Sequence, residues 1–179
     1  RATRPGRPRT AAGTLRDMAS WGEIEQAEPE FAARVREMFD AGRHKTIATL
    51  RADGSPRISG IECELVDGEL RFGSMTGARK GADLQRDPRF ALHGPTFHPE
   101  EGKEGEWPGE AKIAGVAVSA GPVAQPEDDE AGTPSDEDAG EAFVADIAEV
   151  VITRLDEAAT KLVVESWTPA RGLTVVERD

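Results

Sequence analysis

Apolar and polar residues alternate with a period of two from Lys45 onward. The alternation covers residues 45–52 and 57–66 and resumes at 70–75, with the turn sequences DGSP and DG between these segments. Such alternation, broken by turn residues, is typical of β-hairpins whose strands bury one face. We therefore predict three consecutive antiparallel strands.

The chain before this region has helical spacing instead. Ser20 and Glu23 form a capping-box pair, and Pro29 suits the first turn of a further helix that ends near Gly42. Its apolar residues recur three or four positions apart, at Phe31, Val35, Met38 and Phe39. This amphipathic stripe predicts an N-terminal helix that packs on the sheet.

A short helix is expected after the third strand, at residues 78–86. Thr76 or Gly77 stands near its N-cap, and Asp87-Pro88 prevents its continuation. Residues 90–93 then read as another strand.

Arg79 and Lys80 fall in the first turn of this short helix. Free N–H groups and the helix dipole make that end positive, so each cation costs about 0.3–1 kcal/mol unless an anion neutralises it. The hydroxyls of Ser74 and Thr76 and the amide of Gly77 lie nearby, so a phosphate monoester would suit the position. The alternative is a solvated basic turn, and the pattern alone does not separate the two.

The second half of the chain continues the β pattern. Residues 142–147 read as one helical turn, and further strands are expected at 111–124, 149–155, 161–167 and 173–176. The fold class is therefore mainly β, an antiparallel barrel of six or seven strands with few helices.

Two polar segments flank or interrupt this pattern. Residues 1–17 are rich in Arg, Pro, Thr and Ala, and we interpret them as a disordered leader or a remnant of cloning before Met18. Residues 126–141 contain acids, Gly and Pro without a basic residue and predict a mobile acidic loop. The length leaves one folded domain at 18–179.

Charge and cysteine content narrow the class of protein. The formal net charge of −12 argues against nucleic acid or an anionic membrane as partner. No apolar run approaches the roughly 18 residues of a membrane span, and a single cysteine, Cys63, fits a reducing cytoplasm. Cys63 lies among apolar neighbours and is expected to be a buried, inert thiol.

The sequence lacks several common catalytic signatures. His44, His93 and His98 have no metal-ligand spacing, so we predict no metal site. There is also no nucleophile elbow, Walker loop or dinucleotide fingerprint, which removes the usual hydrolase, NTPase and Rossmann classes.

The stretch from Arg57 to Leu92 resembles the pyridoxamine 5′-phosphate oxidase superfamily, the FMN-binding split barrels. The shared pattern is a strand, an Asp-Gly turn, a strand, a Ser/Thr-rich loop, Arg-Lys, a short helix and Asp-Pro-Arg before the next strand. Here the last parts of the pattern are Arg79-Lys80, Leu84 and Asp87-Pro88-Arg89. The resemblance extends over most of residues 30–178.

The resemblance implies a split barrel that binds FMN between the two subunits of a homodimer. It places the phosphate at the Arg-Lys pair and at an arginine that opens the preceding strand, and Trp107 and Trp167 are candidates to lie near the flavin. Trp107 packing onto its own barrel remains an equal alternative. The expected cofactor-binding residues are Arg57, Ile58, Ser59, Gly73, Ser74, Thr76, Arg79, Lys80, Trp107, Glu110 and Trp167.

Two departures concern the substrate. Members that act on pyridoxine phosphate carry an Arg-x-His element near the C-terminus, whereas this chain ends TPARGLTVVERD and has no histidine after His98. Where those enzymes place a glutamine against the flavin, this chain has Glu110. We therefore expect a cytoplasmic FMN-dependent oxidoreductase acting on an unidentified small molecule rather than on pyridoxamine phosphate. The alternatives are an F420-dependent reductase and a flavin- or haem-binding protein without turnover, and no residue stands out as a general acid or base.

Overall fold

The computed structural model describes residues 18–123 and 140–179. Its helices are α1 (Trp21–Ala27), α2 (Pro29–Asp40), α3 (Arg79–Arg86) and a 3₁₀ turn, η1 (Glu104–Glu106). Its strands are β1 (Lys45–Leu50), β2 (Pro56–Ile61), β3 (Cys63–Val66), β4 (Glu69–Ser74), β5 (Arg89–His93), β6 (Glu110–Val123), β7 (Gly140–Leu155), β8 (Leu162–Thr168) and β9 (Gly172–Arg178). The leader at 1–17 and residues 124–139 of the predicted acidic loop lie outside the described residues.

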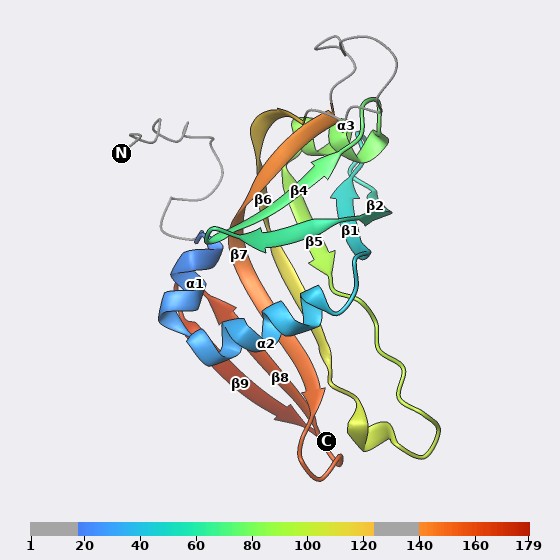
Figure 1. Ribbon diagram of the computed structural model, residues 1–179, viewed down its shortest axis with the longest axis vertical. Coiled ribbons are helices and arrows are strands. Elements are labelled where there is room, and N and C mark those ends of the chain that lie inside the picture. The colour runs from blue at the N-terminus through green and yellow to red at the C-terminus, as the bar shows by residue number, and fades with distance from the viewer. Residues whose placement is uncertain (1–17, 124–139) are drawn as a thin grey trace, which may run out of the picture.

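All strand pairs are antiparallel and belong to one sheet. Its order is β2-β1-β5-β6-β7-β4-β3, with β8 added to β7 and β9 to β8. The sheet curls without closing (Figure 1), and α3 covers one of its ends. The mainly β fold and the split barrel are thus confirmed, and the described residues form nine strands where six or seven were predicted.

The predicted strand at 57–66 is two strands, because the chain changes partners at Glu62. β2 pairs with β1, whereas β3 pairs with β4 across the Asp67-Gly68 turn. Both turn residues have positive φ, 52° and 72°, as a two-residue hairpin turn requires. The bend at Glu62 connects two edge strands of the sheet, β2 and β3.

The helical turn predicted at 142–147 is wrong, because these residues continue β7. Phe143 faces Phe72 on one side and Ser119 on the other, so the segment lies between β4 and β6. Phe143, Ala145 and Ile147 are buried and alternate with half-buried residues, which is the pattern of a strand. Gly140 and Glu141, assigned to the acidic loop from sequence, also belong to β7.

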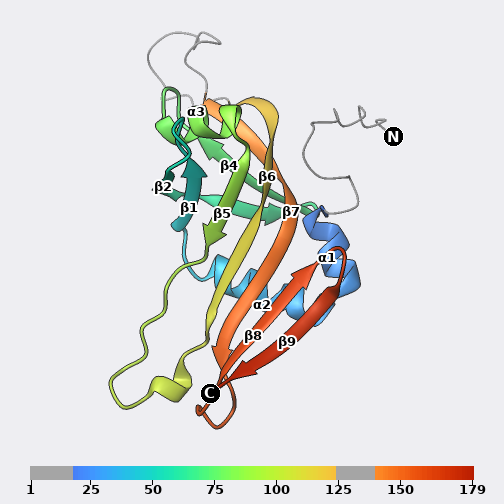
Figure 2. The ribbon, with the colours of Figure 1, turned by 180° about the vertical axis from the view of Figure 1, so that it is seen from behind.

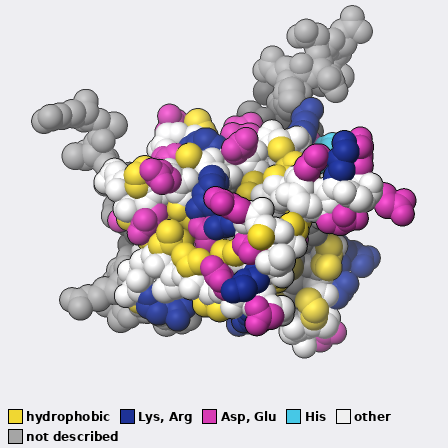
Figure 3. Space-filling view, turned by 90° about the horizontal axis from the view of Figure 1, so that it is seen from below, with side chains coloured by type: hydrophobic (Ala, Val, Ile, Leu, Met, Phe, Trp, Pro, Cys, Tyr) yellow, Lys and Arg dark blue, Asp and Glu magenta, His cyan; other side chains and the backbone are white. Residues whose placement is uncertain are grey.

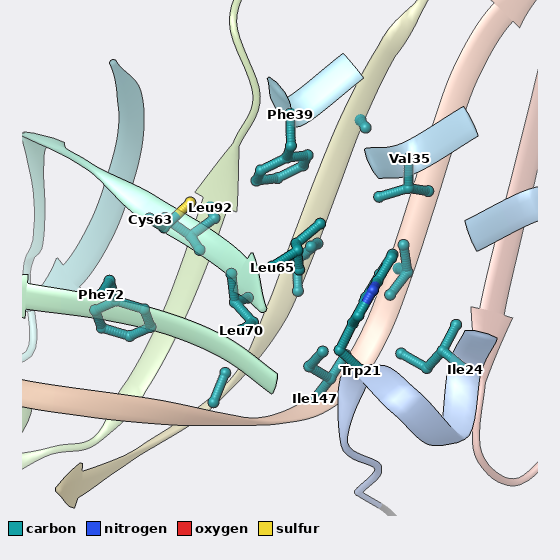
Figure 4. Close-up of a cluster of buried hydrophobic side chains, with 14 of the residues drawn as sticks. Trp21, Ile24, Val35, Phe39, Cys63, Leu65, Leu70, Phe72, Leu92 and Ile147 are labelled. Carbon is teal, nitrogen blue, oxygen red and sulfur yellow. The ribbon is translucent and has the colours of Figure 1, made fainter. Parts of the chain in front are cut away.

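The hydrophobic core lies between the sheet and the two N-terminal helices (Figure 4). The capping box of Ser20 and Glu23 is present at the start of α1, and the predicted stripe of α2 is buried. Trp21, Val35 and Phe39 reach Leu65, Leu70 and Ile147 of the sheet in this cluster. Cys63 is 6% exposed, and burial raises the pKa of its thiol to about 11.

The helices leave the other face of the sheet open, as Figure 2 shows for β1, β5 and β6. The end of the molecule opposite α3 carries basic and acidic side chains interspersed with hydrophobic ones (Figure 3). No helix among residues 18–123 and 140–179 combines the length and apolarity needed to cross a membrane.

Candidate functional site

The first turn of α3 is positively charged, as the sequence predicts. It contains Arg79 and Lys80 and no acidic residue. Its N-cap is Ala78, which makes no side-chain capping bond. The sequence placed Thr76 or Gly77 near the N-cap, and the N-cap Ala78 directly follows Gly77. Among the described residues, no capping side chain or first-turn carboxylate compensates this positive end.

α3 sits against the end of β4 because Gly81 faces Ser74. A Cβ at position 81 would lie 2.7 Å from Ser74 Oγ, closer than real contacts allow. Ser74 is itself only 5% exposed. The missing side chain of Gly81 thus allows the first turn of α3 to approach the sheet.

Asp83, in the middle of α3, is a buried carboxylate that holds two arginines. Arg57 donates through Nε to Asp83 Oδ2 at 2.6 Å, and Arg86 donates through Nη2 to Oδ1 at 3.0 Å. Thr49 Oγ1 donates to Oδ2 at 3.0 Å. Burial opposes the charged form, but these hydrogen bonds outweigh it and lower the pKa of Asp83 to about 2.

A hollow of about 390 Å³ opens between α3 and the β1–β2 turn. Four arginines line it, together with Ala52, Ala82 and the carboxylates of Asp53 and Asp83; the arginines are Arg51, Arg57, Arg79 and Arg86. We call it the arginine hollow. Four guanidinium groups against two carboxylates leave two excess positive charges, on a chain whose formal charge is −12. The described residues offer Arg79 no hydrogen-bond or ion-pair partner.

Lys80 connects this hollow to the edge of the sheet. Its Nζ donates to the carbonyl oxygen of Gly60 on β2 at 2.7 Å. As in any β-strand, successive side chains of β2 point to opposite faces of the sheet. Arg57 lines the arginine hollow on one side, and Ile58, 76% exposed, lies on the other.

A second hollow, of about 500 Å³, lies on the open face of the sheet beside Ile58. We call it the sheet hollow. Its floor contains the small side chains of Ala48 and Ala91, which pair across β1 and β5, and Ile58 pairs with Ala48 from β2. Its remaining lining residues are His44, Lys45, Thr46, Leu92, His93, Gly94, Pro95, Thr96 and Lys112.

A polar chain of three residues borders the sheet hollow. His93 Nδ1 faces the carbonyl of Gly94 at 2.7 Å, and His93 Nε2 faces Glu110 Oε2 at 3.1 Å. Glu110 also accepts from Lys112. Partial burial disfavours the charged carboxylate, but Lys112 and His93 outweigh this and hold the pKa of Glu110 below its ordinary value.

The structure brings some of the predicted site residues together. Arg57 and Arg79 line the arginine hollow, and Lys80 reaches β2 beside it. Ile58 lines the sheet hollow, and Glu110 contacts two of its lining residues. Ser59 lies on the same β2 edge, whereas Gly73, Ser74 and Thr76 lie where β4 ends before α3.

The two predicted tryptophans lie elsewhere. Trp107 follows η1 in the loop between β5 and β6 and is half-buried. Trp167, on β8, is 5% exposed and belongs to the hydrophobic core beside Leu173. Neither lines either hollow.

Sequence reasoning missed Asp83, Arg86, Arg51 and His93. The helical spacing contained a signal for two of them, because Asp83 follows Arg79 by four residues and precedes Arg86 by three. The remaining two depend on which strands become neighbours. The described residues contain no group of three or more His, Cys, Asp or Glu arranged to hold a metal ion.

Comparison with solved structures finds the same fold in distant proteins. A pyridoxamine 5′-phosphate oxidase-related, FMN-binding protein from Nostoc punctiforme aligns over 85% of this chain and 96% of its own, with 12% identity and a TM-score of 0.56. PhzG from Burkholderia lata, solved with tetrahydrophenazine-1-carboxylic acid, aligns over 84% and 87%, with 13% identity and a TM-score of 0.53. At these identities the likeness concerns the fold alone.

Sequence comparison places the chain more firmly. Comparison with curated proteins gives no significant match. The family model described as pyridoxamine 5′-phosphate oxidase, however, matches residues 31–170, which is most of the chain and includes both hollows. The chain belongs to the pyridoxamine 5′-phosphate oxidase family.

Proposed function

We propose that the protein binds FMN and uses it to oxidise or reduce a small molecule. The observation that carries this proposal is Arg79, a cation without a partner among the described residues, in a hollow lined by three more arginines. Membership of the family and the sheet hollow on the other side of β2 support it.

The arginine hollow suits a phosphate monoester. Arg57 spends Nε on Asp83, so its two terminal nitrogens stay available for a planar pair of oxygens. Arg79 adds a second guanidinium, and Lys80 adds an ammonium at the edge of β2. An anion here would also offset the positive end of α3.

The sheet hollow suits a flat ring. Ile58, Ala48 and Ala91 give it an apolar floor with two small side chains, and Lys112 and His93 supply polar groups at the rim. Both hollows border the edge strand β2, one at Arg57 and the other at Ile58, so one flexible ligand could place a phosphate in one and a ring in the other. In this arrangement FMN would supply the redox chemistry, while the protein binds, orients and shields it.

We further propose a homodimer that covers the sheet hollow. Ile58 is 76% exposed, and the helices leave this face of β1, β5 and β6 open (Figure 2). Closed two-fold pairing is the commonest way to cover such a surface. Light scattering at micromolar concentration should give twice the mass of one chain, and the mass of a single chain would refute the dimer.

The substrate is expected to differ from pyridoxamine phosphate. A second phosphate beside the flavin would need its own cations. Arg154 is bound to Glu165 and to the Leu155 carbonyl, and Arg171 is exposed in the turn between β8 and β9. Turnover of pyridoxamine or pyridoxine phosphate by the FMN-loaded protein at about 1–10³ per second would contradict this expectation.

Titration of FMN into wild type and Lys80→Ala tests the cofactor proposal. Loss of one charge-assisted contact should cost about 1.5–3 kcal/mol, a ten-fold or larger loss of FMN affinity. Riboflavin, which lacks the phosphate, should bind both proteins equally. Lys103→Ala is the matched control, because Lys103 pairs with Glu100 in the loop between β5 and β6 and lines neither hollow. Equal FMN affinity of wild type and Lys80→Ala would contradict the assignment.

A further inference from the structure

The arginine hollow extends along two turns of α3. Arg79 and Arg86 stand seven residues apart on α3, so two turns of helix separate them by about 10 Å along the axis on the same face. Ala82, between them on that face, also lines the hollow. The hollow therefore has one end at Arg79 and another at Arg86.

The far end of the hollow has two arginines with spare donors. Arg86 donates through Nη2 to Asp83 and to the Leu50 carbonyl, the latter at 2.6 Å. Arg51 donates through Nη1 to the Ser55 hydroxyl and to the Pro56 carbonyl. In each guanidinium the described contacts leave the other terminal nitrogen and Nε unused, and these bonds fix both groups beside the β1–β2 turn.

Charge balance at this end also favours an anion. Asp83 is saturated by Arg57, Arg86 and Thr49, and Asp53 accepts from the amide and hydroxyl of Ser55 in its own turn. The two carboxylates therefore serve neighbouring groups, while the arginines retain free donors. Among the described residues, only these two carboxylates line the hollow beside the four arginines.

We propose that Arg51 and Arg86 form a second anion subsite, so that the arginine hollow holds two anionic groups at once, the cofactor phosphate and a phosphate or carboxylate group of a second molecule. This deepens the proposed function, since the first group would be the cofactor phosphate at Arg57, Arg79 and Lys80. The second group then lies toward the β1–β2 turn.

Calorimetric titration with inorganic tripolyphosphate and inorganic phosphate tests the subsite without any cofactor. Wild type should bind tripolyphosphate at least ten-fold more tightly than phosphate. The Arg51→Gln variant should lose most of this preference while its phosphate affinity changes less than two-fold. Arg86→Gln should behave alike, and Arg51→Gln keeps the test decisive if Arg86→Gln fails to fold, because Arg51 contacts only an exposed turn. Arg89→Gln is the control, since Arg89 pairs with Asp87 outside the hollow.

A second titration separates this inference from the cofactor proposal. FMN-loaded wild type should still bind one phosphate, and FMN-loaded Arg51→Gln should bind it at least ten-fold more weakly. If FMN fails to bind, the cofactor proposal is wrong, and the tripolyphosphate preference alone decides the subsite. If FMN binds but tripolyphosphate has no advantage over phosphate, or Arg51→Gln weakens both anions equally, the subsite is refuted and the cofactor proposal stands.

Discussion

The molecule has two buried carboxylates that each bind two arginines, Asp83 toward one end and Glu165 toward the other. The two carboxylates differ in how many of the arginine nitrogens they accept from. Glu165, 3% exposed on β8, accepts both terminal nitrogens of Arg34 and the Nε of Arg154. Asp83, also 3% exposed, accepts only Nε from Arg57 and one nitrogen from Arg86. The fork of Arg34 is therefore consumed within the fold, whereas that of Arg57 remains available to a ligand.

The difference shows what separates a structural ion pair from a binding platform. Arg34 ties α2 to β8 and lines neither the arginine hollow nor the sheet hollow. The Asp83 cluster lines a hollow with two excess positive charges. A buried acid between two arginines thus indicates a binding site only where the arginines keep N–H donors that no residue uses and a hollow lies beside those donors.

The largest expected effect is on stability at the Glu165 end. Glu165→Gln leaves Arg34 and Arg154 without their counter-charge, and loss of one partner of a buried pair costs about 3–5 kcal/mol. We expect the lower end of that range, because both arginines are partly exposed. Denaturant unfolding measures the loss, and FMN affinity should not change. Lys161→Gln, which breaks the exposed pair with Glu177, is the control and should cost less than about 1 kcal/mol.

Asp83→Asn should affect both stability and binding. It weakens hydrogen bonds to charged groups, which are worth about 1.5–3 kcal/mol, and it frees Arg57 to move. FMN affinity should therefore fall while riboflavin affinity stays constant. An unchanged ratio of the two affinities would mean that Asp83 serves the fold alone.

The stability difference between wild type and Asp83→Asn should also depend on pH. The pKa of Asp83 is about 2 in the folded protein and ordinary, near 4, when unfolded. The stabilisation that the Asp83 carboxylate contributes to the folded state is then complete above about pH 4. It is lost as pH falls toward 2, since the unfolded state takes up the proton first. The stability difference between wild type and Asp83→Asn should shrink over that interval. A difference that stays constant down to pH 2 would contradict the assignment of charge to Asp83.

The smallest expected effect on stability is that of Arg79→Gln. Because Arg79 has no partner among the described residues, the free energy of unfolding should change by less than about 0.5 kcal/mol. FMN affinity should nevertheless fall about ten-fold through the lost charge-assisted contact. A destabilised variant with normal FMN affinity would reverse the comparison between the two ends.

Local rules predicted much of this fold. The Asp67-Gly68 turn, the capping box at Ser20 and the stop at Asp87-Pro88 each depend on neighbours within a few residues, and each is found as expected. The helix prediction for residues 142–147 failed because their two alanines suit a helix, whereas pairing with β4 and β6 decides their conformation.

The same difference between local and long-range contacts decides which residues of the candidate site could be predicted. Arg79 and Lys80 could be found because helix polarity makes two cations in a first turn unusual. Arg51 and Thr49 could not, because their place beside Asp83 depends on how α3 crosses β1. His93 escaped notice because Glu110, its partner, is 17 residues away and becomes its neighbour only through the pairing of β5 with β6.

The long strands β6 and β7 have a consequence for how the molecule comes apart. β7 pairs with β4 near its start and with β8 near its end, and β6 accompanies it throughout. The two ends therefore share one backbone ladder and cannot unfold as independent units. Native-state hydrogen exchange should find the slowest amides around Ile113 and Val150, which pair with each other and are fully buried, with protection approaching that of global unfolding. The edge strands β2 and β9 should exchange first.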